Sequence, residues 1–397
     1  MSHIKPLTGV RVLDLTRVLA GPFATMLLSD LGAEVLKIEL PGVGDDSRHF
    51  GPFKNDRSLY FVSINRGKKS MTLNLKTPEG KDILRRLVKE HDVLVENFRP
   101  GVMQKLGLDY EELRTINPAL IYAASSGFGH SGPDSKKPAY DILAQAAGGL
   151  MSVTGWPDQS PTRVGCSIGD ISAALFTTIG ILSALNQRHQ TGEGQKIDVA
   201  MLDCQVAILE NALARYQVDG RSPQPLGNRH PTISPFQAYR AQDDWIVVAI
   251  GNDSLWQRFC AAVERNDLAS DSRFSTNPAR TTHLEELNTR LDPLFSQRTV
   301  AQWSSLFSEV GIPHSRINSI EQVMQNRQVQ ARNMIATVED RLAGIVQVAG
   351  NPIKMSGMED STDRPPVPEL GEHTESILTN LGYDEDQIAA MRDQGVV

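Results

Sequence analysis

Gly9-Val10-Arg11-Val12-Leu13-Asp14-Leu15 decides the fold, because it is the first of several short apolar runs that alternate with helical patterns. This run reads as a strand, residues 22–31 read as a helix that ends at Gly32, and residues 33–39 read as the next strand. A strand, a helix and a second strand in this order predict two parallel strands of one sheet.

The same rhythm continues through the first half of the chain. Further strands are predicted at 70–75, 92–96, 120–125 and 196–200, and helices at 79–90, at 171–185 and from about 201 to 216. The fold class that follows is α/β, with a doubly wound, mostly parallel, Rossmann-like sheet. Ligands of such sheets bind at the carboxyl ends of the strands, where residues 16–22, 97–101 and 127–133 are expected.

Composition shifts divide the chain into further segments. We expect a large Rossmann-like domain at 1–216, a linker rich in Pro and Gly at 217–235, a small α+β domain at 236–330, and a linker with a C-terminal segment at 331–397. The small domain opens with a hairpin of residues 236–240 and 245–250, followed by helical patterns to about 330. A strand at 343–348 and helices near 373–394 complete the prediction.

Charge and hydropathy limit the classes of partner. The 397 residues carry a net charge of −7, which disfavours nucleic acid as the main partner. The apolar run at 171–185 is short and rich in Ser and Thr, so no membrane span is predicted. No signal-peptide pattern is found in the first residues.

The chain has three cysteines, Cys166, Cys204 and Cys260. They are too few and too widely spaced to predict a disulfide framework or a zinc site, so no metal is expected. A reduced, cytoplasmic location follows. No histidine lies near Cys166 in the sequence, and Cys166 is interpreted as a small apolar filler.

Asp170 is the main candidate for chemistry. It precedes the almost charge-free run at 171–185, which predicts a largely buried helix. A lone carboxylate at the mouth of such a helix can react with a substrate, or it can cap the helix by accepting a bond from a free backbone N–H. On this pattern alone, capping is the more common role.

Gly127-Phe128-Gly129-His130-Ser131-Gly132 fits the G-x-G-x-x-G pattern of dinucleotide-binding proteins. That pattern requires a helix directly after it, and Pro133 and Pro138 prevent one. We therefore expect a loop that lines the crevice and no nicotinamide cofactor.

Basic groups recur at the predicted strand ends. They are Arg17, Lys37, Lys76, Arg99, Lys105, Lys136 and Lys137. Scattered surface lysines explain most such sets. However, Asn97-Phe98-Arg99 places an amide, a ring and a guanidinium directly after a buried strand, which suits a ligand with phosphates and an adenine.

Six stretches carry a family resemblance. They are residues 6–15, 20–22, 31–39, 65–70, 95–101 and 169–170. Together they resemble the class III CoA-transferases, the family that also holds carnitine-CoA transferases, formyl-CoA transferases and alpha-methylacyl-CoA racemases. The resemblance covers essentially the whole chain.

The resemblance implies that Asp170 is the catalytic aspartate. In such transferases the carboxylate attacks the thioester carbonyl, a mixed anhydride forms, and the returning thiolate gives an aspartyl-CoA thioester. The acceptor acid then displaces CoA through a second anhydride. An ordinary Asp titrates near about pH 4, so we expect Asp170 to be ionised without a partner base.

The racemase branch pairs this aspartate with a histidine, and here Tyr140 stands in the histidine position. A phenol with a pKa of about 10 suits proton exchange at neutral pH poorly, so racemisation is kept as the alternative function. Tyr140 is expected along the CoA arm with Asp141 near the substrate, although a core aromatic is a second interpretation of Tyr140.

The family pattern implies further contacts with CoA. Predicted CoA-binding residues are Arg17, Val18, Ala20, Leu73, Lys76, Asn97, Phe98, Arg99, Lys105, Lys137 and Tyr140. Lys105 replaces an arginine, and Leu19 and Leu40 depart from the formyl-CoA transferase pattern.

Residues 227–231 resemble the branch that moves CoA between acyl-CoAs and dicarboxylates. Arg229 and His230 are therefore predicted to bind substrate, Arg229 through the far carboxylate of a diacid. An ordinary loop arginine remains the second interpretation of Arg229.

The resulting prediction is an acyl-CoA:carboxylate CoA-transferase that uses a dicarboxylate such as succinate or oxalate on one side. CoA and acyl-CoA are substrates, and no permanently bound cofactor is implied. The resemblance also implies an interlocked homodimer and a C-terminal segment that returns to the large domain. A racemase and a non-catalytic CoA-binding protein are the competing functions.

Overall fold

The computed structural model describes residues 4–397, which divide into two compact units. The first unit comprises residues up to 150, residues 164–211 and residues 327–397. The second unit comprises residues 151–163 and 212–326. The first unit is thus assembled from three separate parts of the chain.

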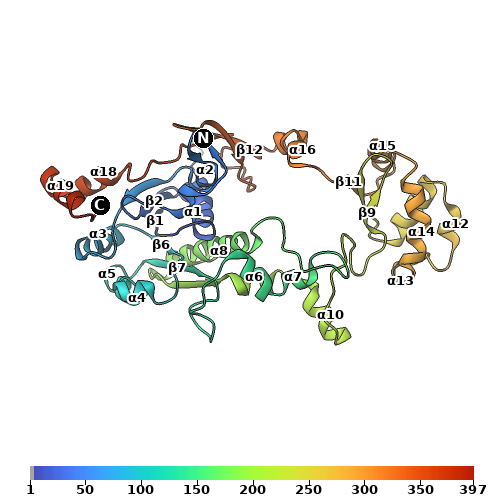
Figure 1. The fold of residues 1–397 in the computed structure, drawn as a ribbon, viewed down its shortest axis with the longest axis horizontal. Coiled ribbons are helices and arrows are strands. Elements are labelled where there is room, and N and C mark those ends of the chain that lie inside the picture. The colour runs from blue at the N-terminus through green and yellow to red at the C-terminus, as the bar shows by residue number, and fades with distance from the viewer. Residues whose placement is uncertain (1–3) are drawn as a thin grey trace. The chain divides into compact units, whose positions relative to one another are not determined.

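A six-stranded sheet forms the centre of the first unit (Figure 1). Its strands are β1 (Arg11–Asp14), β2 (Glu34–Glu39), β5 (Lys69–Thr72), β6 (Val93–Glu96), β7 (Ile121–Ser126) and β8 (Lys196–Ala200). Their order is β5-β2-β1-β6-β7-β8, and all neighbouring pairs are parallel. This confirms the α/β prediction, and the order is that of the doubly wound nucleotide-binding sheets.

Both faces of this sheet are buried, which explains why its strands read as continuous apolar runs. Val12 and Val93 pack on one face with α1 (Ala20–Asp30) and α8 (Ile168–Thr191). Leu13 and Leu94 point to the opposite face. That face is covered by α3 (Pro78–Val88), α5 (Tyr110–Ile116), α18 (Thr374–Asn380) and α19 (Glu385–Asp393).

The C-terminal segment completes the core of the first unit. Val396 and Val397 are buried in it, and the Val396 carbonyl accepts a hydrogen bond of 2.8 Å from the Asn74 N–H. The Arg86 guanidinium of α3 lies 4.8 Å from the ring of Tyr383, between α18 and α19. The two terminal helices therefore lie beside α3, as Figure 1 shows.

Smaller elements surround the sheet. They are the 3-10 helix η1 (Asp46–His49), β3 (Phe53–Lys54), β4 (Arg57–Ser58), α2 (Leu59–Asn65), α4 (Val102–Leu106), α6 (Asp141–Ala147), α9 (Met201–Ala207), α17 (Arg327–Ala331), β12 (Ile335–Asp340), β13 (Gly344–Ala349) and β14 (Asp363–Arg364). Helix α7 (Leu150–Val153) lies where the chain passes into the second unit. Strands β12, β13 and β14 form a separate sheet.

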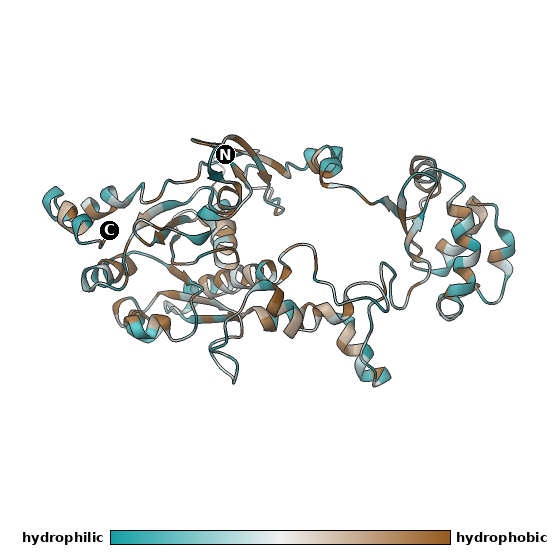
Figure 2. Ribbon diagram, in the orientation of Figure 1, coloured by the Kyte–Doolittle hydropathy of each residue, from teal (hydrophilic) through white to brown (hydrophobic). Residues whose placement is uncertain are grey.

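The second unit has its own aromatic core. Its elements are α10 (Asn211–Asp219), β9 (Phe236–Arg240), β10 (Trp245–Ala249), α11 (Asp253–Ala262), α12 (Asn266–Ser270), α13 (Asn277–Thr282), α14 (Leu284–Phe295), α15 (Val300–Val310), β11 (His314–Arg316) and α16 (Ile320–Met324). Phe295 is fully buried, stacks on Tyr239 at 4.3 Å and lies 5.1 Å from Trp303. Helix α14 alternates between brown and teal in Figure 2, as an amphipathic helix does.

The hairpin of β9 and β10 is confirmed, but two predicted helices differ from the structure and two strands were not predicted. The long helix to residue 216 is wrong, because Glu210 takes a left-handed backbone and separates α9 from α10. Strands β11 and β12 were not predicted, since neither shows a clear apolar alternation. Helix α8 has 24 residues and extends past both predicted ends of the run at 171–185.

By length and composition, α8 is the one helix among residues 4–397 that is able to cross a membrane. The core helix of a soluble protein passes the same test, and half of the apolar window of α8 is buried. It packs against α1, α6, α9 and the strands β7 and β8. Its apolar character is therefore largely explained by burial inside the first unit.

Candidate active site

A cavity of about 550 Å³ opens at the carboxyl ends of β1, β6 and β7; we call it the carboxylate cavity. Of the predicted site residues it is lined by Arg17, Val18, Ala20, Asn97, Phe98, Arg99, Lys137, Tyr140, Asp141 and Asp170. Residues from distant parts of the first unit thus meet at one edge of the sheet, where the fold class places ligands.

A second cavity of about 290 Å³, the apolar cavity, lies beside the first. It is lined by Leu73 and Lys76 together with further apolar side chains of the strand ends, among them Leu15, Ile38, Leu40 and Leu75. Arg17, Phe98 and Val102 line both cavities. One extended ligand is therefore able to occupy the two cavities at once.

Three predicted site residues line neither cavity. Lys105 is exposed in the last turn of α4. Arg229 and His230 belong to the second unit, where the His230 backbone N–H donates to the Phe236 carbonyl at 2.9 Å. Their predicted roles therefore rest on the sequence alone.

Asp170 is the third residue of α8, and the N-cap position is held by Ser167. The capping interpretation of Asp170 is therefore wrong. No other described residue donates a hydrogen bond to its carboxylate, which lies partly buried in the cavity wall. The position in the first helical turn favours a negative charge, because the helix dipole presents its positive end there.

Burial and, to a smaller extent, the nearby charge of Asp141 together raise the pKa of Asp170 to about 7. The expectation of an ordinary Asp that is fully ionised at neutral pH is therefore wrong. A carboxylate that loses hydration without gaining a donor keeps its proton more tightly. Perturbation of this kind is typical of functional sites.

Asp141 anchors the beginning of α8. Its Oδ1 accepts a bond of 2.7 Å from the Gly169 N–H, and its Oδ2 accepts one of 2.8 Å from Gln145. Gln145 in turn accepts from the Val164 N–H at 2.9 Å. This chain of bonds fixes the residue before Asp170, so Asp141 both orients that carboxylate and raises its pKa.

Both polar atoms of the Asn97 side chain form hydrogen bonds with the backbone of Arg17. Its Oδ1 accepts from the Arg17 N–H at 2.9 Å, and its Nδ2 donates to the Arg17 carbonyl at 2.8 Å. The Arg17 guanidinium lies 5.9 Å from the Phe98 ring and 3.3 Å from the Asp46 carboxylate. Asn97 thus positions Arg17 where the two cavities meet.

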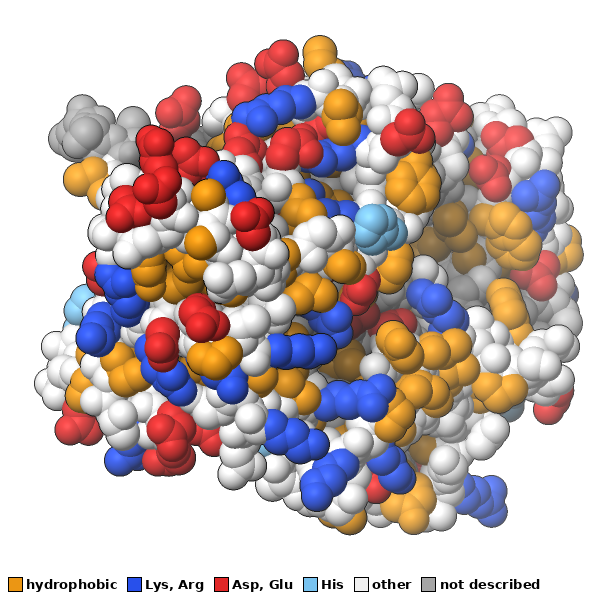
Figure 3. Space-filling model, turned by 60° about the vertical axis from the view of Figure 1, so that its left-hand side comes forward, with side chains coloured by type: hydrophobic (Ala, Val, Ile, Leu, Met, Phe, Trp, Pro, Cys, Tyr) orange, Lys and Arg blue, Asp and Glu red, His pale blue; other side chains and the backbone are white. Residues whose placement is uncertain are grey.

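Positive side chains gather on one face of the molecule despite the net charge of −7. Figure 3 shows lysine and arginine side chains in a band across one face, next to hydrophobic side chains. Arg17, Lys76, Arg99 and Lys137 all line the two cavities, and Arg99 and Lys137 are exposed. Exposed cations beside an apolar pocket suit a ligand that carries phosphates.

Two side-chain interpretations are corrected. Tyr140 is 71% exposed, so it is not a core aromatic, and it lines the carboxylate cavity. Cys166 is exposed, so it is not an apolar filler.

Several residues of the site were not predicted from the sequence. Ser125, Ser126 and Met201 line the carboxylate cavity, and Asp45 and Asp46 line the apolar cavity. Tyr60 also lies near Asp170. Burial and, secondly, the charge of the Asp170 carboxylate raise the pKa of Tyr60 to about 12. The strand-end rule that selected Arg17 and Asn97 also applies to the ends of β2 and β7.

The raised pKa of Asp170 makes the stability of the fold depend on pH. The native state binds more protons than the unfolded state between about pH 4 and pH 7, so stability falls as pH rises through that window. Asp170→Asn removes the group that ionises. At pH 8 we expect this variant to be more stable than the parent by up to about 4 kcal/mol, from the shift of the pKa.

Thermal and urea unfolding between pH 4 and pH 8 measure this difference. Asp203→Asn is the control, because Asp203 is exposed in the first turn of α9. An Asp170→Asn variant that follows the parent curve at every pH contradicts the assignment of a dry carboxylate.

The chain is similar to known proteins over nearly its whole length. The model of CoA-transferase family III matches residues 7–374. The chain is 45% identical over 381 residues to an acetyl-CoA:oxalate CoA-transferase of Acetobacter aceti, covering 96% of this chain and 97% of that protein. It is 40% identical over 396 residues to a succinyl-CoA:glutarate CoA-transferase of Mus musculus, covering 99% and 91%.

Among solved structures, a CAIB/BAIF family protein from Brucella suis has the same fold. The two chains are 38% identical and superpose with a TM-score of 0.83, covering 95% of this chain and 99% of that one. The mixed α/β architecture with its parallel central sheet is therefore shared with that protein.

Proposed function

The chain belongs to CoA-transferase family III and is a CoA-transferase, and we propose that it moves CoA from an acyl-CoA thioester to a free carboxylate, with a dicarboxylate such as oxalate or succinate on one side. The observation that carries this proposal is Asp170. It is a carboxylate without a hydrogen-bond donor among the described residues, set in the wall of a cavity rimmed by cations.

Such a carboxylate suits acyl transfer. One Asp170 oxygen attacks the thioester carbonyl, the C–S bond breaks, and CoA leaves as a thiolate from a mixed anhydride. The thiolate then attacks the aspartyl carbonyl, which releases the first acid as a carboxylate and leaves an aspartyl-CoA thioester. The acceptor carboxylate attacks this thioester to form a second anhydride, and the thiolate finally takes the acceptor acyl group. No proton is transferred in any step, so no partner base is required.

Partial burial serves this sequence in two ways. An anhydride reacts with water, so a cavity that excludes water protects the intermediates. A carboxylate that has lost hydration is also a stronger nucleophile than one in bulk water. The cost is that Asp170 is partly protonated at neutral pH, so the reactive form increases as pH rises through about 7.

We propose that acyl-CoA spans the two cavities. The apolar cavity suits the adenine ring, and Phe98 lies at its border. Arg17 stands where the cavities meet and suits the diphosphate, with Lys76 on the side of the nucleotide. The pantetheine arm then follows the carboxylate cavity past Tyr140 to Asp170.

We further propose an interlocked homodimer. Apolar side chains remain exposed on neighbouring helices of the first unit: Ile142 and Leu143 on α6, Phe176 and Ile179 on α8, and Val206 on α9. Exposed apolar patches of this kind mark interaction surfaces. The segments 217–235 and 340–370 contain prolines, and as linkers they would permit each chain to pass through the other.

Sedimentation equilibrium tests the dimer. We expect twice the chain mass of 43.6 kDa, and we expect Ile179→Lys to weaken association. A monomer at high concentration would contradict the proposal.

A cytoplasmic location is also proposed. It is supported by the three cysteines, all of which are unpaired, with Cys204 and Cys260 buried. Cell fractionation tests it.

Covalent trapping tests the catalytic assignment. After addition of acyl-CoA, borohydride or hydroxylamine is expected to modify Asp170 and no other carboxylate, as mass spectrometry of peptides reports. The yield should be higher at pH 8 than at pH 6, because the attacking form is ionised. Asp170→Ala should lose turnover by a factor of at least about 10³ while CoA binding persists.

Asp203→Asn serves as the control for this experiment and is expected to be trapped like the parent. Normal turnover by Asp170→Ala would refute the mechanism. Exchange of the acyl α-proton with solvent deuterium would instead favour a racemase.

A panel of acyl-CoAs with short mono- and dicarboxylates identifies the acids. We expect dicarboxylates to be preferred, and we expect Arg229→Ala to raise the KM for a dicarboxylate by about tenfold or more, the range of a lost bidentate contact. The KM for a monocarboxylate should change little. Arg221→Ala, an exposed arginine nearby in the sequence, is the control. Equal effects on both classes of acid would contradict the role of Arg229.

A further inference from the structure

The turn Thr16–Val18 joins β1 to α1 at the junction of the two cavities. Thr16 lines the apolar cavity, Val18 lines the carboxylate cavity, and Arg17 lines both. A displacement of this turn would alter both cavities together.

Val18 holds a backbone conformation that its side chain disfavours. Its φ is +69°, in the left-handed region, where a β-branched residue is a rare outlier. Such a conformation persists only when surrounding contacts impose it. Here these contacts are hydrogen bonds between neighbouring side chains and the backbone of the turn.

Four side chains from separate parts of the chain hold the backbone of the turn. Asp14 accepts from the Thr16 N–H at 2.9 Å, and the Lys37 ammonium donates to the Thr16 carbonyl at 2.8 Å. Asp45 accepts from the Val18 N–H at 3.0 Å. With the two bonds from Asn97 to Arg17, five backbone groups of the turn are occupied by side chains.

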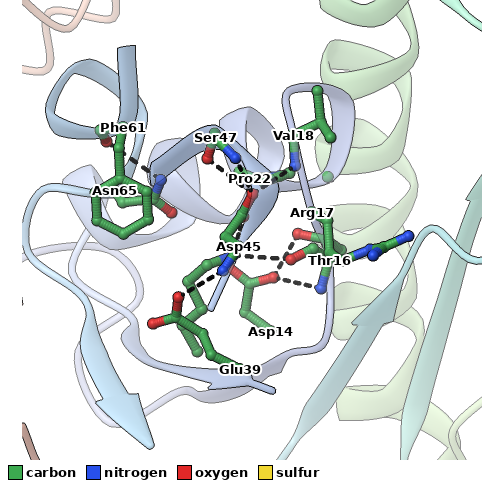
Figure 4. Close-up of polar contacts among 12 residues, drawn as sticks. Asp14, Thr16, Arg17, Val18, Pro22, Glu39, Asp45, Ser47, Phe61 and Asn65 are labelled. Carbon is green, nitrogen blue, oxygen red and sulfur yellow. Dashed lines mark hydrogen bonds and ion pairs between the residues drawn. The ribbon is translucent and has the colours of Figure 1, made fainter. Parts of the chain in front are cut away.

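Two of these side chains form an ion pair with no solvent exposure. Lys37 Nζ lies 2.7 Å from Asp45 Oδ2, and both side chains are 0% exposed. Burial opposes the charge of Lys37, but Asp14, Asp45 and Glu39 outweigh it, so the pKa of Lys37 is raised and it stays charged. Asp45 also accepts hydrogen bonds from the backbone N–H and the hydroxyl of Ser47. Figure 4 shows Asp45 between Ser47, Val18 and Glu39, with Asp14 beneath Thr16.

A second buried ion pair of the same unit shows what a purely structural pair looks like. Arg66 and Asp30 lie 2.8 Å apart and are 2% and 5% exposed. Neither residue lines the carboxylate or the apolar cavity, and neither bonds to the turn. The bonds of Lys37 and Asp45, in contrast, end on the turn that carries Arg17.

We propose that Lys37 and Asp45 are positioning residues for acyl-CoA, which act by holding the Thr16–Val18 turn between the two cavities, with Val18 in its left-handed conformation. The inference rests on the proposed function for the identity of the ligand. It concerns how the binding surface is maintained, and neither residue touches a reacting atom.

Asp45→Asn is the direct test. The substitution keeps an oxygen for the Val18 N–H but turns an amide NH₂ group toward the Lys37 ammonium, so two donors face each other. We expect the turn to relax, because repulsion between the two donors displaces the Lys37 ammonium from the Thr16 carbonyl and shifts the side-chain oxygen at position 45 away from the Val18 N–H. The dissociation constant of CoA, measured by calorimetry, should rise at least about tenfold, since small misplacements of a binding group have effects of this size.

Val18→Gly in the Asp45→Asn background provides a readout that a general loss of stability would not give. Glycine adopts a positive φ without strain, so the turn no longer depends on the pair to hold it there. We expect the double variant to bind CoA more tightly than Asp45→Asn alone. If the double variant loses as much affinity as the two single changes together, Val18 is not coupled to the pair and the inference fails.

Asp30→Asn is the matched control, because it breaks a buried ion pair that does not contact the turn. It should lower the melting temperature as Asp45→Asn does, without changing the affinity for CoA. Equal affinities of Asp45→Asn and Asp30→Asn would refute the positioning role while leaving the transferase intact. A parent protein that binds no CoA would refute the proposed function itself.

If Asp45→Asn does not fold, Ser47→Ala replaces it. This change removes the hydroxyl that donates to Asp45 Oδ1 at 2.8 Å and leaves the ion pair in place. A smaller loss of CoA affinity, again reduced by Val18→Gly, is expected, and an unchanged affinity would overturn the inference.

Discussion

The strand order of the parallel sheet is the constraint on which the rest of the molecule depends. Because β1 lies between β2 and β6, the chain leaves β1 toward one side and leaves β6 toward the other. A crevice must open between these two connections. The hydrogen bonds between Arg17 and Asn97 join the two connections at the base of this crevice. Both cavities extend from Arg17. The order of the strands thus determines where a ligand binds, whatever side chains line the crevice.

Loss of hydration affects the paired and the unpaired charged side chains of the site differently. Lys37 and Asp45 are completely dry, but each has a partner, so their charges persist. Asp170 is only partly dry and has no donor, so its charge is held weakly and its pKa rises to about 7. Paired charges hold the backbone, whereas the unpaired one is available to react. The same physical factor, loss of hydration, gives opposite results because the partners differ.

The sequence predicted what depends on local pattern. The strands of the parallel sheet, the helix that carries Asp170 and the residues at the ends of β1 and β6 follow from apolar runs and from the topology of parallel sheets. The state of Asp170 could not be predicted, because its pKa depends on Asp141 and on burial by elements far away in the chain. Asp45 was missed for a similar reason: in sequence it is one acidic residue in a loop, and only folding brings Lys37 and Val18 to it.

The return of the C-terminal segment to the first unit has a consequence for biosynthesis. Val396 and Val397 fill part of the core beneath β5 and α3, yet the whole second unit is translated before them. The parallel sheet therefore cannot finish its core while the ribosome is still making the inserted unit. Contacts of such long sequence separation form slowly. The nascent chain must carry an incomplete, partly apolar surface through most of its synthesis, which makes it a natural client for chaperones.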